Sequence, residues 1–106
     1  MLNPEFLING PGPRLAFLSQ PDPKLVAENM VAFANTEGGT LVVGMTDEGE
    51  LAEKTDLETL GKALREADGQ CNPSVVTGSW EAVETDEGTV YALRIPRSIE
   101  LHALTD

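Results

Sequence analysis

The sequence predicts an α+β fold, a two-layer sandwich in which two helices cover one face of a mixed sheet of about four to five strands. Two observations predict this class. Residues 22–35 and 55–69 repeat apolar side chains at helical spacing. Short apolar runs, several of them rich in β-branched residues and bounded by glycine, proline or acidic turns, lie around these two segments. The predicted order is β-α-β-β-α-β-β, which is typical of an α+β sandwich.

Residues 1–13 are predicted to form an arm ahead of the domain. The segment contains three prolines and two glycines. Proline has no amide donor and glycine is entropically costly to order, so this composition disfavours a regular element. The folded domain is expected over residues 14–96, with a first strand at residues 14–18.

The first helix is expected to begin after Asp22, a suitable N-cap, with Pro23 at the first helical position. Its apolar side chains form a wide stripe, which predicts a largely buried helix. The stripe consists of Val26, Ala27, Met30, Val31, Phe33 and Ala34. The helix should stop at residues 35–39, where paired glycines can take left-handed angles.

Residues 40–46 are apolar on both faces and predict a central strand. The acidic segment 47–50 then predicts a hairpin turn that leads into a short strand near Leu51. Thr55 and Glu58 have the spacing of a capping box, which would start the second helix. Leu57, Leu60, Leu64 and Ala67 should form its buried side, and Gly69 should end it.

A hairpin is expected to complete the sheet, with strands at residues 75–84 and 89–95 and a turn at 85–88. In the second of these strands Tyr91, Leu93 and Ile95 alternate with Val90, Ala92 and Arg94. Residues 97–106 are predicted to be a tail, or a linker to downstream domains. His102 is expected to be a tail residue with no ligand role.

The composition excludes several classes of protein. The chain has 106 residues, a net charge of −11 and a hydrophobic content of 41%. This apolar content suits one folded domain, whereas the negative charge disfavours tight binding of a polyanion by this chain alone. One cysteine, Cys71, and one histidine cannot supply a disulfide or a cysteine–histidine zinc site. Neither a membrane-spanning run nor a secretory signal is visible, so a cytoplasmic protein is expected. No cofactor or metal is expected either.

The richest motif joins the end of the first helix to the central strand. Asn35 and Thr36 are expected to satisfy the last helix carbonyls, and the glycines to form the turn. The segment has an acidic residue between Thr36 and Gly38. With this motif, the chain resembles the Schlafen/AlbA-type DNA-binding domain family over about residues 14–96. The residues that carry the resemblance, with a mainly structural role, are Phe33, Ala34, Asn35, Thr36, Gly38, Gly39, Thr40, Gly44 and Asp47.

The resemblance implies the same α+β sandwich and a role in nucleic-acid contact. In bacteria such domains resemble modules of transcriptional regulators, and in eukaryotic Schlafen proteins related domains cleave RNA with acidic residues and a metal. Many members carry Glu-Phe-Lys in the first strand, where this chain has Ala16-Phe17-Leu18. The carboxylate and lysine are therefore missing, which argues against nuclease activity. ATP hydrolysis is also excluded, because no glycine-rich loop here ends in Gly-Lys-Ser/Thr.

Positive charge is scarce. Arg94 and Arg97 are the first choice for a phosphate-binding surface, followed by Lys62 and Arg65 on the second helix; pairing with nearby glutamates is the structural alternative. The acidic run from Asp47 to Glu58 is expected to be a solvated hairpin tip followed by a helix start, since its spacing does not match a calcium loop.

These observations predict a non-enzymatic regulatory module of a transcriptional regulator that contacts nucleic acid, within the full-length protein. The alternative is a protein-interaction domain, such as a homo-oligomer formed by pairing of edge strands. A degenerate metal-dependent nuclease is the remote alternative.

Overall fold

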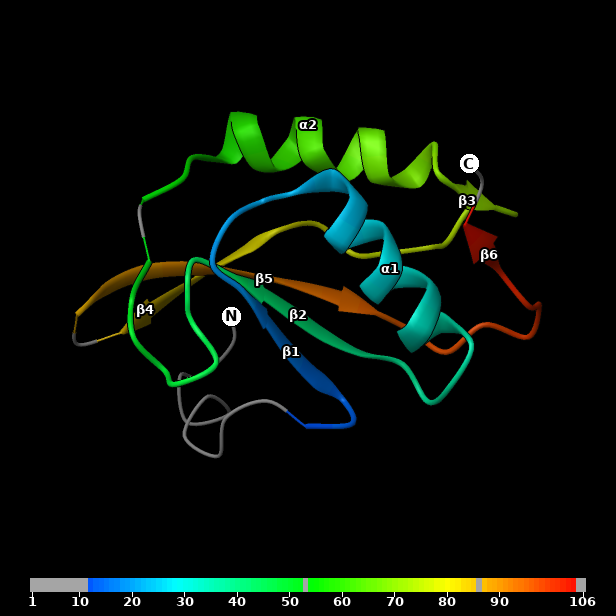
Figure 1. Ribbon diagram of the computed structural model, residues 1–106, viewed down its shortest axis with the longest axis horizontal. Coiled ribbons are helices and arrows are strands. Elements are labelled where there is room, and N and C mark those ends of the chain that lie inside the picture. The colour runs from blue at the N-terminus through cyan, green and yellow to red at the C-terminus, as the bar shows by residue number, and fades with distance from the viewer. Residues whose placement is uncertain (1–11, 53, 86, 105–106) are drawn as a thin grey trace.

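The computed structural model describes residues 12–52, 54–85 and 87–104 (Figure 1). Its main sheet has the order β1-β2-β5-β4, with β1 parallel to β2 and the other neighbours antiparallel. The strands are β1 (Leu15–Leu18), β2 (Gly39–Val43), β4 (Glu81–Thr85) and β5 (Gly88–Ile95). A second sheet pairs β3 (Cys71–Asn72) with β6 (Ala103–Leu104), and the helices are α1 (Pro23–Ala34) and α2 (Leu57–Asp68). The predicted α+β class, with a mixed sheet, is confirmed.

The first helix begins and is buried as its sequence predicts. The Asp22 side chain accepts a hydrogen bond from the Lys24 amide at 2.9 Å, and Pro23 occupies the first turn. Val26, Ala27, Met30 and Ala34 are completely buried, and Phe33 is 6% exposed. Figure 1 shows α1 lying across the sheet with α2 alongside it.

Both helices contribute to one core on the same face of the sheet. Leu41 and Val43 from β2, and Leu93 and Ile95 from β5, pack there against α1 and α2. The indole Nε1 of Trp80 donates a hydrogen bond of 3.0 Å to the Leu60 carbonyl, which ties the segment before β4 to α2. The two-layer arrangement follows from this shared core.

The opposite face carries a second, smaller core, which consists of Phe17, Val42, Met45, Val83, Val90 and Ala92. Leu51 packs against it from the loop after β2. That loop returns through one antiparallel bridge between Met45 and Leu51. The strand expected near Leu51 is therefore only this bridge. A loop, rather than a third helix, covers part of this face.

The start of α2 differs from the prediction. Asp56, not Thr55, is the N-cap, and its carboxylate accepts a hydrogen bond of 2.7 Å from the Thr59 amide. This hydrogen bond holds the pKa of Asp56 below its usual value. The predicted capping box is wrong because the helix begins one residue later. Its buried side also shifts to Leu60, Ala63 and Ala67, leaving Leu57 57% exposed.

The strand predicted over residues 75–84 begins only at Glu81. Before it, Val75 turns into the helix-side core and Trp80 bonds to α2, so residues 75–80 cannot follow the alternation of a strand. The hairpin itself is confirmed, with Val83 opposite Val90. The alternation in β5 is confirmed too, since Leu93 and Ile95 belong to one core and Val90 and Ala92 to the other.

The two ends of the chain complete the picture. Most of the arm predicted over residues 1–13 lies outside the described residues. Residues 97–104, expected as a tail or linker, pack onto the domain: the Ser98 amide donates to the Ala34 carbonyl at 2.8 Å and β6 pairs with β3. Neither described helix is long and apolar enough to span a membrane.

Candidate nucleic-acid interface

The helix–turn–strand motif is held by close packing. Gly38 has a φ of +81°, and a Cβ atom there would lie 2.8 Å from the Arg97 nitrogen and from the Ile95 oxygen. A Cβ atom on Gly39 would lie 2.5 Å from the Phe33 ring. Only glycine fits at these two positions, because one touches backbone and the other a buried ring. The turn therefore presses the start of β2 against the end of β5.

The polar residues of the motif have separate structural tasks. The Thr36 hydroxyl donates to the Ala32 carbonyl at 2.9 Å, as expected for a residue that satisfies the helix end. The amide of Gly38 donates to the Phe33 carbonyl at 2.8 Å. Since this amide has a protein partner, it is not a free donor for a phosphate.

Asn35 does something that the sequence did not predict. Its backbone amide donates to the Val31 carbonyl at 3.0 Å, as expected at the helix end. Its side chain instead makes two hydrogen bonds with the backbone of His102: Nδ2 donates to the carbonyl at 2.9 Å, and Oδ1 accepts from the amide at 2.8 Å. His102 is only 8% exposed, so this residue of the expected tail is buried against the domain. Its Nδ1 lies 2.7 Å from the Pro73 carbonyl and its Nε2 lies 2.8 Å from the Ser98 hydroxyl.

Two arginines meet at a hollow on the sheet. Arg14 and Arg94 line a cavity of about 440 Å³ together with Gly39 and Thr40. Thr40 pairs with Leu15 on one side and with Arg94 on the other, so β2 separates the two arginines. Arg94 follows Val90 and Ala92 in the alternation of β5, which places it on the face opposite the helices.

The other predicted basic residues divide between two regions. Arg97 is exposed and follows β5, and its backbone nitrogen borders the Gly38 turn, so it belongs to the end of the sheet that carries the hollow. Lys62 and Arg65 are exposed on α2, in the helical layer on the other face. The structure therefore brings Arg94 together with Arg14, a residue that sequence reasoning missed. Arg97 follows β5 but does not line the hollow, and the α2 pair lies apart.

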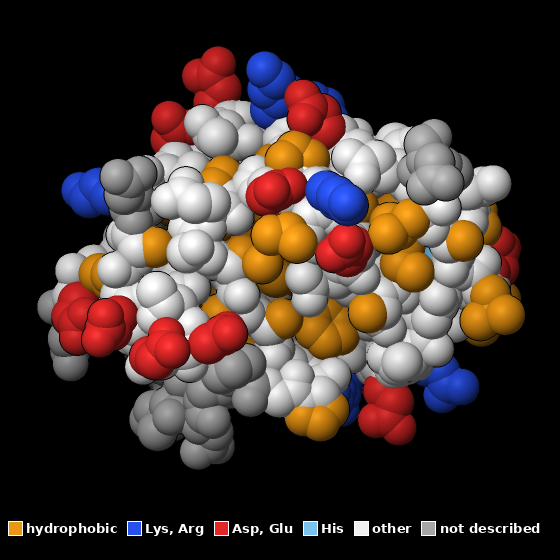
Figure 2. Space-filling view, in the orientation of Figure 1, with side chains coloured by type: hydrophobic (Ala, Val, Ile, Leu, Met, Phe, Trp, Pro, Cys, Tyr) orange, Lys and Arg blue, Asp and Glu red, His pale blue; other side chains and the backbone are white. Residues whose placement is uncertain are grey.

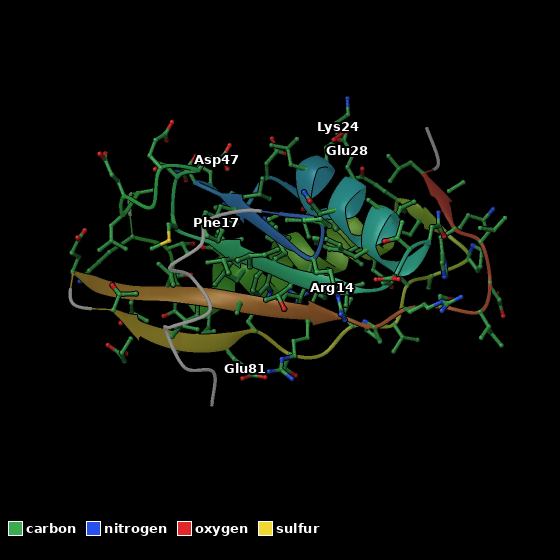
Figure 3. The ribbon with its side chains drawn as sticks, turned by 90° about the horizontal axis from the view of Figure 1, so that it is seen from below. Arg14, Phe17, Lys24, Glu28, Asp47 and Glu81 are labelled. Atoms are coloured by element: carbon green, nitrogen blue, oxygen red, sulfur yellow. The ribbon has the colours of Figure 1, made fainter. Side chains whose placement is uncertain are left out.

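Glutamates border this basic region. Arg14 Nη2 donates to the Glu37 backbone carbonyl at 3.4 Å, and Glu37 is exposed. Glu81 of β4 pairs with Ala92 of β5, two residues before Arg94. Glu81 therefore lies on the same face of the sheet as Arg94, one pair of residues further along β5. Figure 3 shows Arg14 and Glu81 on this side of the molecule, with Asp47 toward the other end of β1. The arginines thus form a local basic site in an acidic protein.

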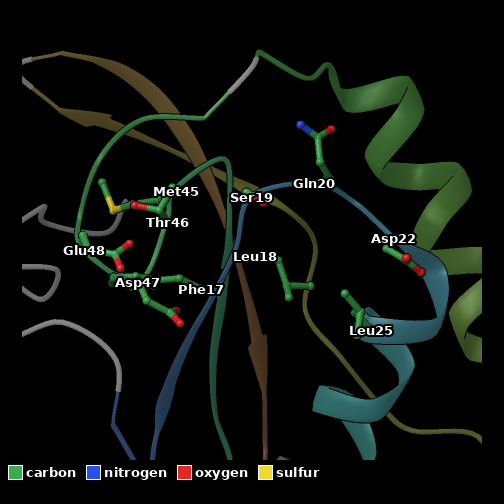
Figure 4. Close-up of a pocket in the computed structure, with 10 residues that line it drawn as sticks. All are labelled: Phe17, Leu18, Ser19, Gln20, Asp22, Leu25, Met45, Thr46, Asp47 and Glu48. Carbon is green, nitrogen blue, oxygen red and sulfur yellow. The ribbon is translucent and has the colours of Figure 1, made fainter.

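The first-strand positions where the resemblance expects Glu-Phe-Lys lie in β1. Phe17 is 7% exposed and Ala16 packs against the helix-side core. Asp47 is exposed in the loop after β2 and lines a second hollow that also includes Phe17 and Leu18 (Figure 4). Among the described residues, no three His, Cys, Asp or Glu side chains group closely enough to hold a metal ion.

Cys71 is not a reactive candidate in this structure. Its thiol is 6% exposed and lies 3.4 Å from the Ala67 carbonyl. Burial raises the pKa of the Cys71 thiol, and the charge of Asp68 raises it further. A thiol held in its protonated form is a poor nucleophile.

None of the curated proteins compared with this chain matches it. Among solved structures, the chain is similar to the DIP2311 protein from Corynebacterium diphtheriae, with a TM-score of 0.65 and 17% sequence identity. The likeness covers 88% of this chain and 19% of that protein, so this chain spans about a fifth of its length. At this identity the likeness supports the fold alone.

The family model described as Schlafen, AlbA_2 matches residues 15–106. The match includes the helix–turn–strand motif and also residues 97–104, which the structure packs onto the domain. This extent agrees with a folded unit that continues past β5, and it covers most of the sequence. The chain therefore belongs to the Schlafen AlbA_2 family.

Proposed function

We propose that this chain is a non-enzymatic regulatory module of a transcriptional regulator, and that it contacts nucleic-acid phosphates through Arg14, Arg94 and Arg97. The observation that carries the proposal is the hollow of about 440 Å³ between Arg14 and Arg94. Guanidinium groups bind phosphate oxygens through charge-assisted, often bidentate hydrogen bonds. Membership of the AlbA_2 family supports nucleic acid as the source of the phosphate.

The shape of the site suits backbone contact rather than base reading. Gly39 contributes no side chain, and Thr40 offers a hydroxyl that can donate to a phosphate oxygen. Contacts of this kind position a protein on nucleic acid without specifying sequence. In a longer regulator, sequence recognition would then come from other domains.

The net charge of −11 sets the expected strength. Three arginines neutralise about three phosphates, so the logarithm of affinity should fall with the logarithm of salt with a slope of about −2 to −3. Repulsion from the many carboxylates lowers affinity further. Binding by the domain alone should therefore be weak and detectable only at low salt.

The test measures fluorescence anisotropy of labelled duplex and single-stranded oligonucleotides with the full chain at about 50 mM salt. Arg94→Glu combined with Arg97→Glu should abolish binding. The matched control, Lys62→Glu with Arg65→Glu, makes the same change of charge on α2 and should leave much of the binding intact. All four side chains are exposed, so both variants should fold.

Two results would overturn the proposal. One is the absence of any anisotropy change with wild-type protein at high micromolar concentration. The other is an equal loss in both double variants, because general charge rather than the hollow would then explain binding.

A further inference from the structure

A second hollow lies at the carboxyl ends of the parallel strands β1 and β2, and it has a cavity volume of about 310 Å³. Its lining comes from the end of β1 and the loop after it, the start of α1, and the loop after β2 (Figure 4). The volume is at the small end of the range for ligand sites, roughly 300–1,000 Å³. Two segments of the chain, residues 17–25 and 45–48, therefore build one small cavity.

The lining has two different characters. Leu18 and Leu25 supply most of the apolar surface, since Leu25 is 40% exposed whereas Phe17 and Met45 are only 7% and 6% exposed. Asp47 and Glu48 supply exposed carboxylates, and the lining contains no lysine or arginine. The hollow thus combines apolar walls with a negative rim.

The rim is held in place by its own turn. The Thr46 amide donates to the Glu50 carbonyl at 2.8 Å, and the Thr46 hydroxyl accepts from the Glu50 amide at 3.2 Å. The Gly49 amide also donates to the Thr46 carbonyl at 2.9 Å. These hydrogen bonds fix the turn from Thr46 to Glu50, which contains Asp47 and Glu48, and neither carboxylate takes part in them.

The third carboxylate of the lining has another task. Asp22 accepts the hydrogen bond that caps α1, so it is committed to the helix end. Asp47 and Glu48 are the two acidic groups that remain for a ligand, and they are neighbours in one turn. Figure 2 shows acidic side chains gathered over the region of the loop after β2 that Figure 1 draws in green.

We propose that this hollow receives a lysine or arginine side chain from a basic segment of a partner protein. Lysine and arginine have an apolar stem and a cationic head, and such side chains lay the stem along apolar surface while the head stays at a polar rim. Leu18 and Leu25, with the small exposed parts of Phe17 and Met45, match the stem, and Asp47 and Glu48 match the head. The net charge of −11 would draw a basic segment toward this surface over long range.

The site is distinct from the arginine hollow and reaches beyond the nucleic-acid proposal. The two hollows lie at opposite ends of β2, a five-residue strand, which corresponds to a separation of about 15 Å at a rise of about 3.3 Å per residue. The acidic end repels phosphate and the basic end attracts it. One domain could therefore hold nucleic acid at one end and a basic protein at the other.

The test uses the full chain and an eight-residue fluorescent peptide of alternating Lys/Arg and Ser, with its lysine-acetylated, arginine-free counterpart as the uncharged probe. Asp47→Asn with Glu48→Gln should weaken binding of the basic peptide by about tenfold. The matched control, Glu66→Gln with Glu100→Gln, removes two exposed carboxylates elsewhere and should change affinity by less than about twofold. Leu25→Ala should weaken binding without changing its salt dependence.

NMR chemical shifts of the wild-type protein provide a second readout. Addition of the basic peptide should move the amides of residues 17–25 and 45–48 first. An equal loss of affinity in both charge variants, or shifts spread over all acidic surfaces, would overturn the proposal. Binding of the acetylated peptide as tightly as the basic one would overturn it too. Arg94→Glu with Arg97→Glu leaves this hollow intact and makes the chain more acidic, so this variant should bind the basic peptide at least as tightly as wild type. This proposal and the nucleic-acid proposal can therefore fail separately.

Discussion

Replacement of Asn35 by alanine tests how residues 97–104 are attached to the domain. The substitution removes two hydrogen bonds, of 2.9 and 2.8 Å, between the Asn35 amide and the backbone of His102. At about 1 kcal/mol for each bond, the free energy of unfolding should fall by about 2 kcal/mol. For a domain of this size, that loss lowers the melting temperature by about 8–16 °C.

Asn29→Ala is the matched control because Asn29, which lies in α1, is also an asparagine whose side chain is hydrogen-bonded to backbone. Its Nδ2 donates to the Leu25 carbonyl at 2.9 Å, within the helix itself. Loss of this local bond should change the free energy of unfolding by less than about 0.5 kcal/mol. Urea unfolding followed by circular dichroism measures both variants.

Hydrogen exchange locates the effect in the Asn35 variant. The His102 amide loses its acceptor, so it should exchange much faster, whereas the amides of β2 and β5 should change only with global stability. If Asn35→Ala is as stable as wild type and protection of the His102 amide is unchanged, the attachment of residues 97–104 does not depend on this contact, and the reasoning fails.

The remaining predictions concern a glycine, a helix cap and the cysteine. Gly39→Ala should lower the free energy of unfolding by about 1–3 kcal/mol, since its Cβ would overlap the buried Phe33 ring; unchanged urea unfolding would contradict this packing. Asp56→Ala should lower the melting temperature at neutral pH. Because the folded-state pKa of Asp56 is lowered, the difference in melting temperature from wild type should be lost as pH falls through that pKa. A difference that stays constant in acid would contradict the capping role of Asp56. Cys71 should react slowly with iodoacetamide in the native protein and rapidly in urea, and equal rates would show that the thiol is not buried.

Local chemistry in the sequence was enough to predict α1 and its connection to β2. Asp22 and Pro23 mark a helix start whatever the rest of the chain does, and the stripe that contains Phe33 leaves one buried side. The same holds for the alternation in β5. In each case the signal lies in neighbouring residues, so tertiary structure does not need to be known.

The errors arise where distant contacts decide. Residues 75–80 have apolar and β-branched character, but Trp80 bonds to Leu60 on α2, and that contact is invisible in the local pattern. His102 is buried because of Asn35, 67 residues earlier in the chain. An asparagine at a helix end has several common uses, so its sequence position alone does not reveal a partner this far away.

The candidate sites show the same division. The scarcity of positive charge in the sequence points to Arg94, but the nearness of Arg94 to Arg14 depends on the register of three strands. Asp47 lies in an exposed loop, as its sequence predicts, whereas the apolar wall of the same hollow is assembled from Leu18 at the end of β1 and Leu25 of α1. The association of edge strands between copies of the chain stays a prediction.

The order of the strands has a consequence for synthesis on the ribosome. β2 lies at the centre of the sheet, yet its antiparallel partner is far along the chain: Gly39 pairs with Ile95 and Val43 with Tyr91. Loop closure over such separations is slow, and β2 must wait with one edge unpaired until β5 has left the exit tunnel. A nascent chain interrupted before Ile95 would therefore expose the apolar centre of the sheet, which makes such fragments natural clients for chaperones.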